Sequence, residues 1–460
     1  MNLPARAWLL PHTARVARAA SRIFYRIRVA GEKPPATGPV LFVANHPNSL
    51  VDPVLVTAAA DRPVRFLAKA PLFEERLVGP MVNAAGAIPV YRRQDDPALV
   101  ERNASVFEQV HAALARGDAV GIFPEGLSHS EPSLARLRTG AARIALGAAE
   151  RANVEALIVP IGIVLPQKDR FRSRAYVLVG HPVDWRDLAG QGEADSEAVR
   201  QLTDRIEDAL RDLTINLERI DDGPLIACAE AVYAAELHLG RAPEERVRRM
   251  RQASERLREL REDQPERIEE LLGRLRSFSA ALDSLELSPR GLEAEARPRA
   301  AVGWTAWNLV FFLLGAPATL LGSVLFFIPY AATDWIGRRP GLSPDIRSAR
   351  KLLGGGMLYI LWCGLLSILA TWWFGIPAGI AAAVSLPLLA LLTLVVRERW
   401  RDARREVRQY FVLRRSGDVR DELLRRRGEL ARMLESLRRE GSGIAPAGGA
   451  GPTDGNGGTG

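Results

Sequence analysis

The sequence predicts an α/β domain followed by a helical connector and C-terminal transmembrane or re-entrant helices. Three observations support this fold class. Short apolar, β-rich runs alternate with longer amphipathic stretches between about residues 38 and 182. Charged sequence without strand signals follows from 196 to about 287, and dense apolar runs occupy 304–396. A chain of 460 residues is too long for one core, so two or three units are expected.

Residues 1–30 are predicted to form a basic amphipathic helix at a membrane interface. From Trp8 to Val29 arginines alternate with apolar residues, a composition typical of helices on anionic bilayers. A helix packed on the following domain fits the same pattern, and both interpretations stay open. The arginines interrupt any apolar core, which argues against a signal peptide and favours a cytoplasmic catalytic part.

The α/β domain is predicted to span residues 31–195. Its clearest strands are short apolar runs, and an amphipathic helix is expected at Leu99–Arg116. The runs lie at 40–44, 119–123, 157–163 and 175–179. This alternation indicates a single, largely buried sheet.

A charged helical connector is predicted from 196 to 300, with breaks near Gly223–Pro224 and at 241–243. Beyond the membrane region, residues 398–440 are expected to form one long charged helix. The Gly-rich tail at 441–460 is expected to be disordered.

The membrane region is predicted at 301–397. Its stretches 353–374 and 376–396 are each long enough to cross a hydrocarbon core of about 30 Å, and the short turn at Gly375 makes them a hairpin. Arginine clusters flank both ends, so both ends should face the cytoplasm. We therefore expect an integral membrane protein with its catalytic domain on the cytoplasmic face, of the plasma membrane in a bacterium.

The first apolar stretch, residues 305–330, conflicts with that topology. One full crossing would separate the α/β domain from the arginine clusters. Splitting at Pro317 leaves halves of about 12 residues, about 18 Å of helix, too short to span. A re-entrant or shallow hairpin is predicted, and a true span that breaks the positive-inside rule is the alternative.

Composition narrows the partners. The net charge of +8 and a pI near 9.9 suit nucleic acid or an anionic membrane, and the apolar runs favour the membrane. We therefore expect membrane lipids and no nucleic acid among the partners. The two cysteines, Cys228 and Cys363, lack CxxC or Cys/His spacing, so neither a disulfide framework nor a metal site is expected.

The strongest local signal is Leu41–Asp52, where an apolar strand runs into Asn45 and His46 and then into turn residues. If the chain turns at Pro47–Ser49, Asp52 can hold one imidazole nitrogen while the other accepts a proton from a hydroxyl. On its own, such a His–Asp pair also fits a structural role.

Three further blocks follow in the chain. Residues 86–93 form an apolar segment that ends in Arg92 and Arg93, two cations suited to a phosphate. Residues 121–130 form a strand that enters a turn at Glu125. Residues 157–162 form an apolar strand with Pro and Gly. Each block alone also fits an ordinary strand or strand end.

Together, the order and spacing of the four blocks resemble the glycerolipid acyltransferase family, which includes glycerol-3-phosphate and 1-acylglycerol-3-phosphate acyltransferases. The resemblance covers about residues 35–185 and implies an α/β acyltransferase domain with His46 as general base and Asp52 as its orienting partner. It also implies residues that bind the substrates. These are Arg92, Glu125, Gly126 and Ser128 for the glycerol phosphate part of the acceptor, Arg93 and Lys69 as further candidates, and Pro160 on the acyl-donor side.

One feature departs from the usual family pattern. Five residues separate His46 from Asp52, where the family usually has four. This spacing, with Ser128–His129 and the run Leu137–Ala142, looks like the fungal-type subgroup that acylates glycerol 3-phosphate or dihydroxyacetone phosphate.

The resemblance implies transfer of a fatty acyl group from acyl-coenzyme A or acyl carrier protein to one of those acceptors, in phosphatidic acid and phospholipid synthesis. It implies no cofactor and no metal. Two alternatives stay open: acylation of 1-acylglycerol 3-phosphate or another lysophospholipid, and a catalytically silent lipid-binding scaffold. His129 is the one serious rival to His46, and the oligomeric state is undetermined by the sequence.

Overall fold

The computed structural model describes most of the chain. The described residues are 10–76, 78–91, 103–129, 131, 133–166, 171–219, 221–240, 242–285, 287–293, 298–337, 344–415 and 417–441. The predicted tail from 442 onward and the cations Arg92 and Arg93 lie outside them.

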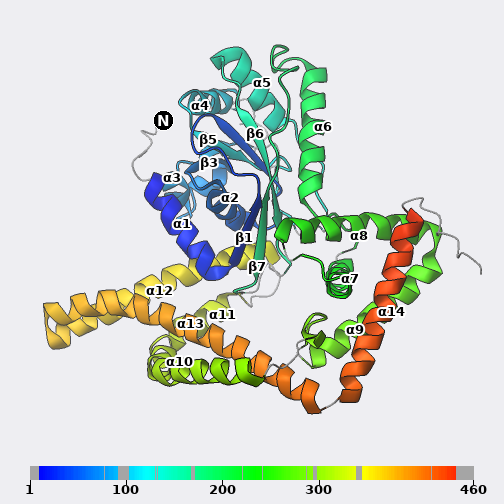
Figure 1. Cartoon of the computed structure of the whole chain (residues 1–460). Coiled ribbons are helices and arrows are strands. Elements are labelled where there is room, and N and C mark those ends of the chain that lie inside the picture. The colour runs from blue at the N-terminus through cyan, green and yellow to red at the C-terminus, as the bar shows by residue number, and fades with distance from the viewer. Residues whose placement is uncertain are drawn as a thin grey trace, which may run out of the picture.

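A seven-stranded sheet forms the centre of the N-terminal domain (Figure 1). Its order is β1-β7-β6-β2-β5-β3-β4, and every neighbouring pair is parallel except β6 with β7. The strands are β1 (Arg26–Gly31), β2 (Val40–Ala44), β3 (Val64–Lys69), β4 (Ile88–Val90), β5 (Ala119–Ile122), β6 (Leu157–Val164) and β7 (Arg174–Val179). The predicted α/β class is confirmed, with one antiparallel pair in a mostly parallel sheet.

Helices cover both faces of this sheet, which explains why its central strand is apolar throughout. Leu41 and Val43 of β2 face a core formed with α4 (Asn103–Ala115), α5 (Gly140–Ala152) and α6 (Ser196–Leu213). The alternate residues of β2 face a second core formed largely with α2 (Asp52–Ala60). All five residues of β2 are buried.

The connector folds as charged amphipathic helices with a leucine-rich core. They are α7 (Asp222–Glu236), α8 (Pro243–Asp263) and α9 (Pro265–Ser284), which pack with the C-terminal α14 (Gly417–Gly441). The predicted break at 241–243 is confirmed. The break expected near Gly223–Pro224 is also confirmed, because α6 ends at Leu213 and α7 begins at Asp222, with both residues in its first turn, where proline is tolerated.

Four apolar or partly apolar helices follow the connector: α10 (Pro298–Leu325), α11 (Phe327–Gly337), α12 (Pro344–Phe374) and α13 (Ile376–Arg415). Among the described residues, the segments at 354–374 and 376–404 are long and apolar enough to cross a membrane. They meet at Gly375, whose φ of +86° suits glycine and closes the predicted hairpin. Helices α10 and α11 form a bent pair that could serve as a third, broken span or a re-entrant loop.

The predicted split at Pro317 is wrong. Helix α10 continues through this proline, and the chain instead bends by 57° at Phe326, between α10 and α11. A proline removes one backbone donor, here the one that would bond to the carbonyl of Leu313, and an apolar helix can continue past such a gap.

Two other boundaries differ from the prediction. The N-terminal helix α1 (Leu10–Phe24) ends before Arg26, and 26–31 form the edge strand β1 rather than more helix. The charged helix expected at 398–440 is two helices, because α13 runs from the apolar stretch to Arg415 and α14 follows. Smaller elements are η1 (Ser49–Val51), η2 (Ala70–Phe73), α3 (Gly79–Ala84) and η4 (Gly291–Glu293).

Candidate active site

His46 and Asp52 meet directly beyond the carboxyl end of β2. The Nδ1 atom of His46 lies 2.9 Å from Oδ2 of Asp52. The Asp52 carboxylate is fully buried, and the same oxygen accepts the backbone N–H of Asn48 at 2.6 Å. The contact predicted from the sequence is therefore present.

The five intervening residues fold so that the two side chains converge. Ser49 has a φ of +48°, and Ser49–Val51 form the single 3-10 turn η1. Helix α2 then begins at Asp52, with Pro53 in its first turn. The extra residue relative to the usual family spacing is thus accommodated in a tight turn without separating the pair.

The environment of His46 leaves its second ring nitrogen for chemistry. A buried carboxylate only accepts hydrogen bonds, so Nδ1 donates and Nε2 of the neutral ring carries the lone pair. The ring stacks on Phe123 with centroids 4.0 Å apart and planes 9° apart. The side chain of His46 is 18% exposed, which leaves a route to a substrate.

Glu125, in the third sequence block, hydrogen-bonds to the first block, which carries His46. It follows β5, the neighbour of β2, and Oε1 accepts the backbone N–H of His46 at 2.7 Å. Oε2 accepts the backbone N–H of Ala135 at 2.9 Å and also contacts Nε2 of His129. Glu125 is 2% exposed, so in this structure both its oxygens serve the protein. Its predicted contact with the acceptor stays a prediction.

His129 is enclosed in this network. Its backbone N–H donates to the carbonyl of His46 at 3.4 Å, and its Nε2 contacts Glu125. The other ring nitrogen is buried and has no hydrogen-bond partner among the described residues. This enclosure makes His129 a weaker candidate base than His46.

The turn after Glu125 requires glycine. Gly126 has a φ of +71°, and a Cβ built there would lie 2.7 Å from Nε of Arg138. The backbone N–H of Arg138 donates to the carbonyl of Pro124 at 2.8 Å. Oγ of Ser128 accepts the N–H of Ser49 at 2.9 Å, so this turn also supports the turn that carries His46.

The remaining predicted site residues lie at different positions along the sheet. Lys69 is exposed at the carboxyl end of β3, paired with Val90 of β4. Arg92 and Arg93 follow β4 but lie outside the described residues. Pro160 is buried within β6 beside Val43, in the sheet and not at its carboxyl edge.

Three residues that were not among the predicted site residues help to build the site. The side chain of Asn45 bonds both backbone groups of Ile163, at 2.7 and 3.0 Å, and joins β2 to β6. Asn48 is fully buried and donates to the hydroxyl of Tyr25 at 2.9 Å. Arg138 lies beside the turn at Gly126. Arg138 belongs to the run 137–142 that resembles the fungal-type subgroup, so this run could have identified Arg138 from the sequence.

The C-terminal apolar region reaches the site. Helix α12 contacts η1, the turn between His46 and Asp52. Figure 1 shows α12 and α13 beneath the sheet. The candidate active site therefore borders a helix that is apolar enough to cross a membrane.

Comparison with known proteins agrees with this geometry. The model of the acyltransferase family matches residues 26–164, a range that includes β1, the His46–Asp52 turn and the Glu125 turn. Residues 26–164 are an acyltransferase-family domain. Glycerol-3-phosphate O-acyltransferase 2 of Saccharomyces cerevisiae is 35% identical over 134 residues, 28% of this chain and 18% of that protein. Glycerol-3-phosphate O-acyltransferase 1 of the same yeast is 36% identical over 115 residues, 24% of this chain and 15% of that protein.

Two further proteins are similar to parts of this chain. An uncharacterised acyltransferase of Schizosaccharomyces pombe is 23% identical over 300 residues, 46% of this chain and 44% of that protein. The crystal structure of a 1-acyl-sn-glycerophosphate acyltransferase from Thermotoga maritima aligns with a TM-score of 0.35 and 19% identity, over 45% of this chain and 79% of that one. The chain spans less than a fifth of the length of the two Saccharomyces enzymes.

Proposed function

We propose that this protein is a membrane-bound O-acyltransferase that acylates a hydroxyl of glycerol 3-phosphate or dihydroxyacetone phosphate. The donor is an acyl thioester of coenzyme A or acyl carrier protein, and the product enters phosphatidic acid synthesis. The observation that carries this proposal is the His46–Asp52 pair at the carboxyl end of β2, inside an acyltransferase-family domain. The similarity to two yeast glycerol-3-phosphate acyltransferases supports the choice of acceptor.

The proposed chemistry starts at Nε2 of His46. Asp52 holds the Nδ1 proton and stabilises the imidazolium that forms when Nε2 removes the proton of the acceptor hydroxyl. The acceptor oxygen then forms a bond to the thioester carbonyl carbon and gives a tetrahedral intermediate. Its collapse breaks the carbon–sulfur bond, and the thiolate takes the proton back from His46. Neither a metal nor a covalent enzyme intermediate is part of this proposal.

We propose that cations at the carboxyl ends of neighbouring strands bind the acceptor phosphate. Lys69 ends β3, Arg92 and Arg93 follow β4, and Arg138 lies beside the turn after β5. Guanidinium groups suit this task because their paired N–H donors match phosphate oxygens. We also propose that Pro160 lies on the acyl-donor side of the site, and only the resemblance to the acyltransferase family supports this role.

A lysophospholipid acceptor is the second candidate, and one observation favours it. Helix α12 contacts the turn between His46 and Asp52, so an acceptor held in the bilayer would have a short path to the base. A soluble acceptor needs only a phosphate site, whereas a lysolipid also needs contact with such an apolar helix.

The membrane placement is part of the proposal. We propose that α12 and α13 cross the bilayer as a hairpin, with the catalytic domain and the end of α13 on the cytoplasmic face. The bent pair of α10 and α11 is proposed to enter the bilayer without crossing it.

The test compares acceptors directly. Purified full-length protein in phospholipid vesicles receives labelled acyl-coenzyme A with glycerol 3-phosphate, dihydroxyacetone phosphate or lysophosphatidate. The proposal predicts acyl product from at least one of the first two acceptors. Product from lysophosphatidate alone would replace the first candidate with the second. Absence of product from all three, with acyl carrier protein donors also inactive, would favour the scaffold.

A further inference from the structure

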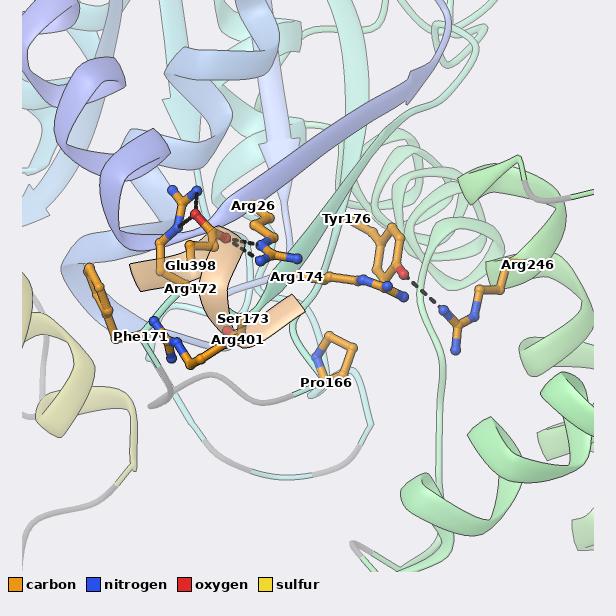
Figure 2. Close-up of a pocket in the computed structure, with 10 residues that line it drawn as sticks. All are labelled: Arg26, Pro166, Phe171, Arg172, Ser173, Arg174, Tyr176, Arg246, Glu398 and Arg401. Carbon is orange, nitrogen blue, oxygen red and sulfur yellow. Dashed lines mark hydrogen bonds and ion pairs between the residues drawn. The ribbon is translucent and has the colours of Figure 1, made fainter. Parts of the chain in front are cut away.

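A cavity of about 310 Å³ opens where α13 meets the edge of the sheet formed by β1 and β7 (Figure 2). Its lining is strongly basic, with five arginines and one carboxylate. The arginines are Arg26, Arg172, Arg174, Arg246 and Arg401, and the carboxylate is Glu398. The residues come from segments more than 370 positions apart in the chain, so this cavity exists only when α13 is docked.

Part of the positive charge is already neutralised by protein groups. Glu398 pairs with both Arg26 and Arg172, and Arg26 also lies 3.3 Å from Asp402. Figure 2 shows Glu398 with Arg26 and Arg172 at one side of the cavity. At the other side, Arg246 donates to the hydroxyl of Tyr176 at 3.0 Å and also pairs with Glu230 at 3.1 Å.

Arg174 and Arg401 carry the charge that remains. Neither has a carboxylate partner among the described residues, and both side chains are exposed to solvent. The described contact of the Arg401 side chain is a 3.4 Å hydrogen bond from Nε to the carbonyl of Arg397. The five arginines of the lining face Glu398, Asp402 and Glu230, and Glu230 is shared with Arg249 outside the cavity, so positive charge is in excess.

The chemistry of the lining favours a phosphate ester. Arg174 of β7 and Arg401 of α13 each carry paired N–H donors of the kind that bind phosphate oxygens. Figure 2 shows Arg174 directed toward Tyr176 and Arg401 directed toward Phe171, so these exposed side chains must turn inward to meet one phosphate. A volume of about 310 Å³ lies at the lower end of the range for small-molecule pockets, about 300–1,000 Å³. The cavity is therefore large enough for a phosphate ester and not only for an inorganic phosphate ion.

The position of the cavity favours a lipid as the source of that phosphate. The apolar run of α13 ends at Val396, five residues before Arg401. Phe171 lines the cavity and is 41% exposed, and the neighbouring Trp400 is 46% exposed. Exposed aromatic rings beside arginines, directly after a membrane-length apolar helix, are typical of the headgroup layer.

We infer that this cavity binds the phosphate of an anionic phospholipid, with Arg174 and Arg401 as its principal ligands. The bound lipid bridges β7 and α13 and so fastens the membrane hairpin to the catalytic domain. This inference rests on the proposed membrane placement of α13 and is independent of the proposed acyl transfer.

Binding is tested on the full-length protein, delipidated in neutral detergent micelles. Phosphatidylglycerol or zwitterionic phosphatidylcholine is added, and the lipid that stays bound is counted by native mass spectrometry. The protein should bind phosphatidylglycerol at least about tenfold more tightly than phosphatidylcholine, because charge-assisted bonds to phosphate are strong. The R174Q/R401Q double variant should lose this preference.

The matched control is R248Q/R258Q, which removes two exposed arginines of α8 that have no ion pair among the described residues. It should bind phosphatidylglycerol as the unmodified protein does. His46→Ala should also bind it fully while losing acyl transfer, which separates failure of this inference from failure of the proposed enzyme function. If the double variant does not fold, R174Q and R401Q are tested singly, and each should weaken binding several-fold.

Two results would overturn the inference. One is an unchanged preference for phosphatidylglycerol in folded R174Q/R401Q or in both single variants. The other is displacement of the lipid by millimolar inorganic phosphate or coenzyme A. If either compound also binds in the absence of lipid, and loses binding in R174Q/R401Q, the cavity is a site for a soluble phosphate.

Discussion

At the residue scale, the proposed reaction depends on the Asp52 carboxylate. It is fully buried and bonded to His46, so its charge sets which ring nitrogen of His46 carries the proton. Asp52→Asn keeps the size of the side chain but removes that charge and presents an amide that can orient the ring wrongly. We expect kcat to fall by a factor on the order of 10²–10⁴ with substrate KM values little changed.

Steady-state kinetics with each acceptor measure this effect. Asp61→Asn is the matched control, because Asp61 ends the same helix with its carboxylate exposed and paired with Arg18. It should keep normal turnover. Full activity in Asp52→Asn would remove Asp52 from the mechanism.

Glu125 could support the turn that carries His46 or bind the acceptor, and the sequence could not distinguish these two roles. Its oxygens accept the N–H groups of His46 and Ala135, and a glutamine would replace one acceptor oxygen with a donor. We therefore expect Glu125→Gln to lower kcat by displacing the turn that carries His46. Exposed Glu131→Gln serves as control. A rise in acceptor KM with unchanged kcat would instead assign Glu125 to acceptor binding.

Arg138 provides a test of the proposed phosphate site. Its guanidinium lies beside Gly126 and is exposed, free to face a phosphate from the turn after β5. Arg138→Gln should raise the KM for the phosphorylated acceptor about tenfold and leave the KM for the acyl donor unchanged. Arg136→Gln, an exposed neighbour, should change neither. Equal KM values in the two variants would argue against Arg138.

At the scale of elements, four buried strands were predictable, whereas the edge strand β1 and the internal strand β3 were not. The runs 40–44 and 119–122 are apolar throughout because helices cover both faces of the sheet. Strand β1 carries Arg26 and Arg28 among apolar residues, a pattern that also fits an amphipathic helix. Its strand conformation comes from pairing with β7, almost 150 residues later, which no local pattern encodes.

Helix boundaries were missed where tertiary context outweighs local signals. Pro317 was expected to end a helix, yet α10 continues through it. The change from apolar to charged sequence after Val396 was taken as an element boundary. Arginine and glutamate are good helix formers, so nothing there stops α13, which runs on to Arg415.

The contact between α4 and α5 should make stability depend on pH. His111 of α4 is 4% exposed and packs against Gly147 of α5, and this burial lowers the pKa of its imidazole, with Glu193 and Arg151 nearby. The unfolded chain therefore takes up a proton near pH 6.5 while the folded chain does not. The free energy of unfolding is therefore highest above that pH, and it falls as the pH drops from about 6.5 toward the pKa of His111 in the folded protein.

Thermal unfolding of the full-length protein at pH 7.5, 6.5 and 5.5 measures this loss. His111→Gln should show a smaller fall of Tm between pH 7.5 and 5.5 than the unmodified protein. His12→Gln, at an exposed position on α1, should leave the fall as it is. An identical fall in His111→Gln would show that other groups cause it.

At the scale of the whole molecule, the sequence predicted the parts but not how they meet. The catalytic domain, the connector and the hairpin each carried a compositional signal. The contact of α12 with η1, and the ion pairs of Glu398 with Arg26 and Arg172, join positions 226 or more residues apart. They make the apolar helices α12 and α13 part of the surroundings of the site, which no motif indicated.

The proposed topology has a direct test by cysteine labelling. In a Cys228→Ser/Cys363→Ser background, Trp373→Cys places a thiol at the exposed tip of the hairpin, and Asp418→Cys places one at the start of α14. A membrane-impermeant maleimide should label Trp373→Cys in intact cells. It should label Asp418→Cys only after the cells are permeabilised. Labelling of both positions from the same side would contradict a membrane-crossing hairpin.

The central claim is that His46 is the base of an acyl transfer reaction. It is tested most directly by the rate of acyl transfer to glycerol 3-phosphate in His46→Ala, with exposed His181→Gln as control. We expect a loss on the order of 10²–10⁴ in kcat for His46→Ala, full activity for His181→Gln and an unchanged fold in both. Acyl transfer that continues at the normal rate without His46 would contradict it.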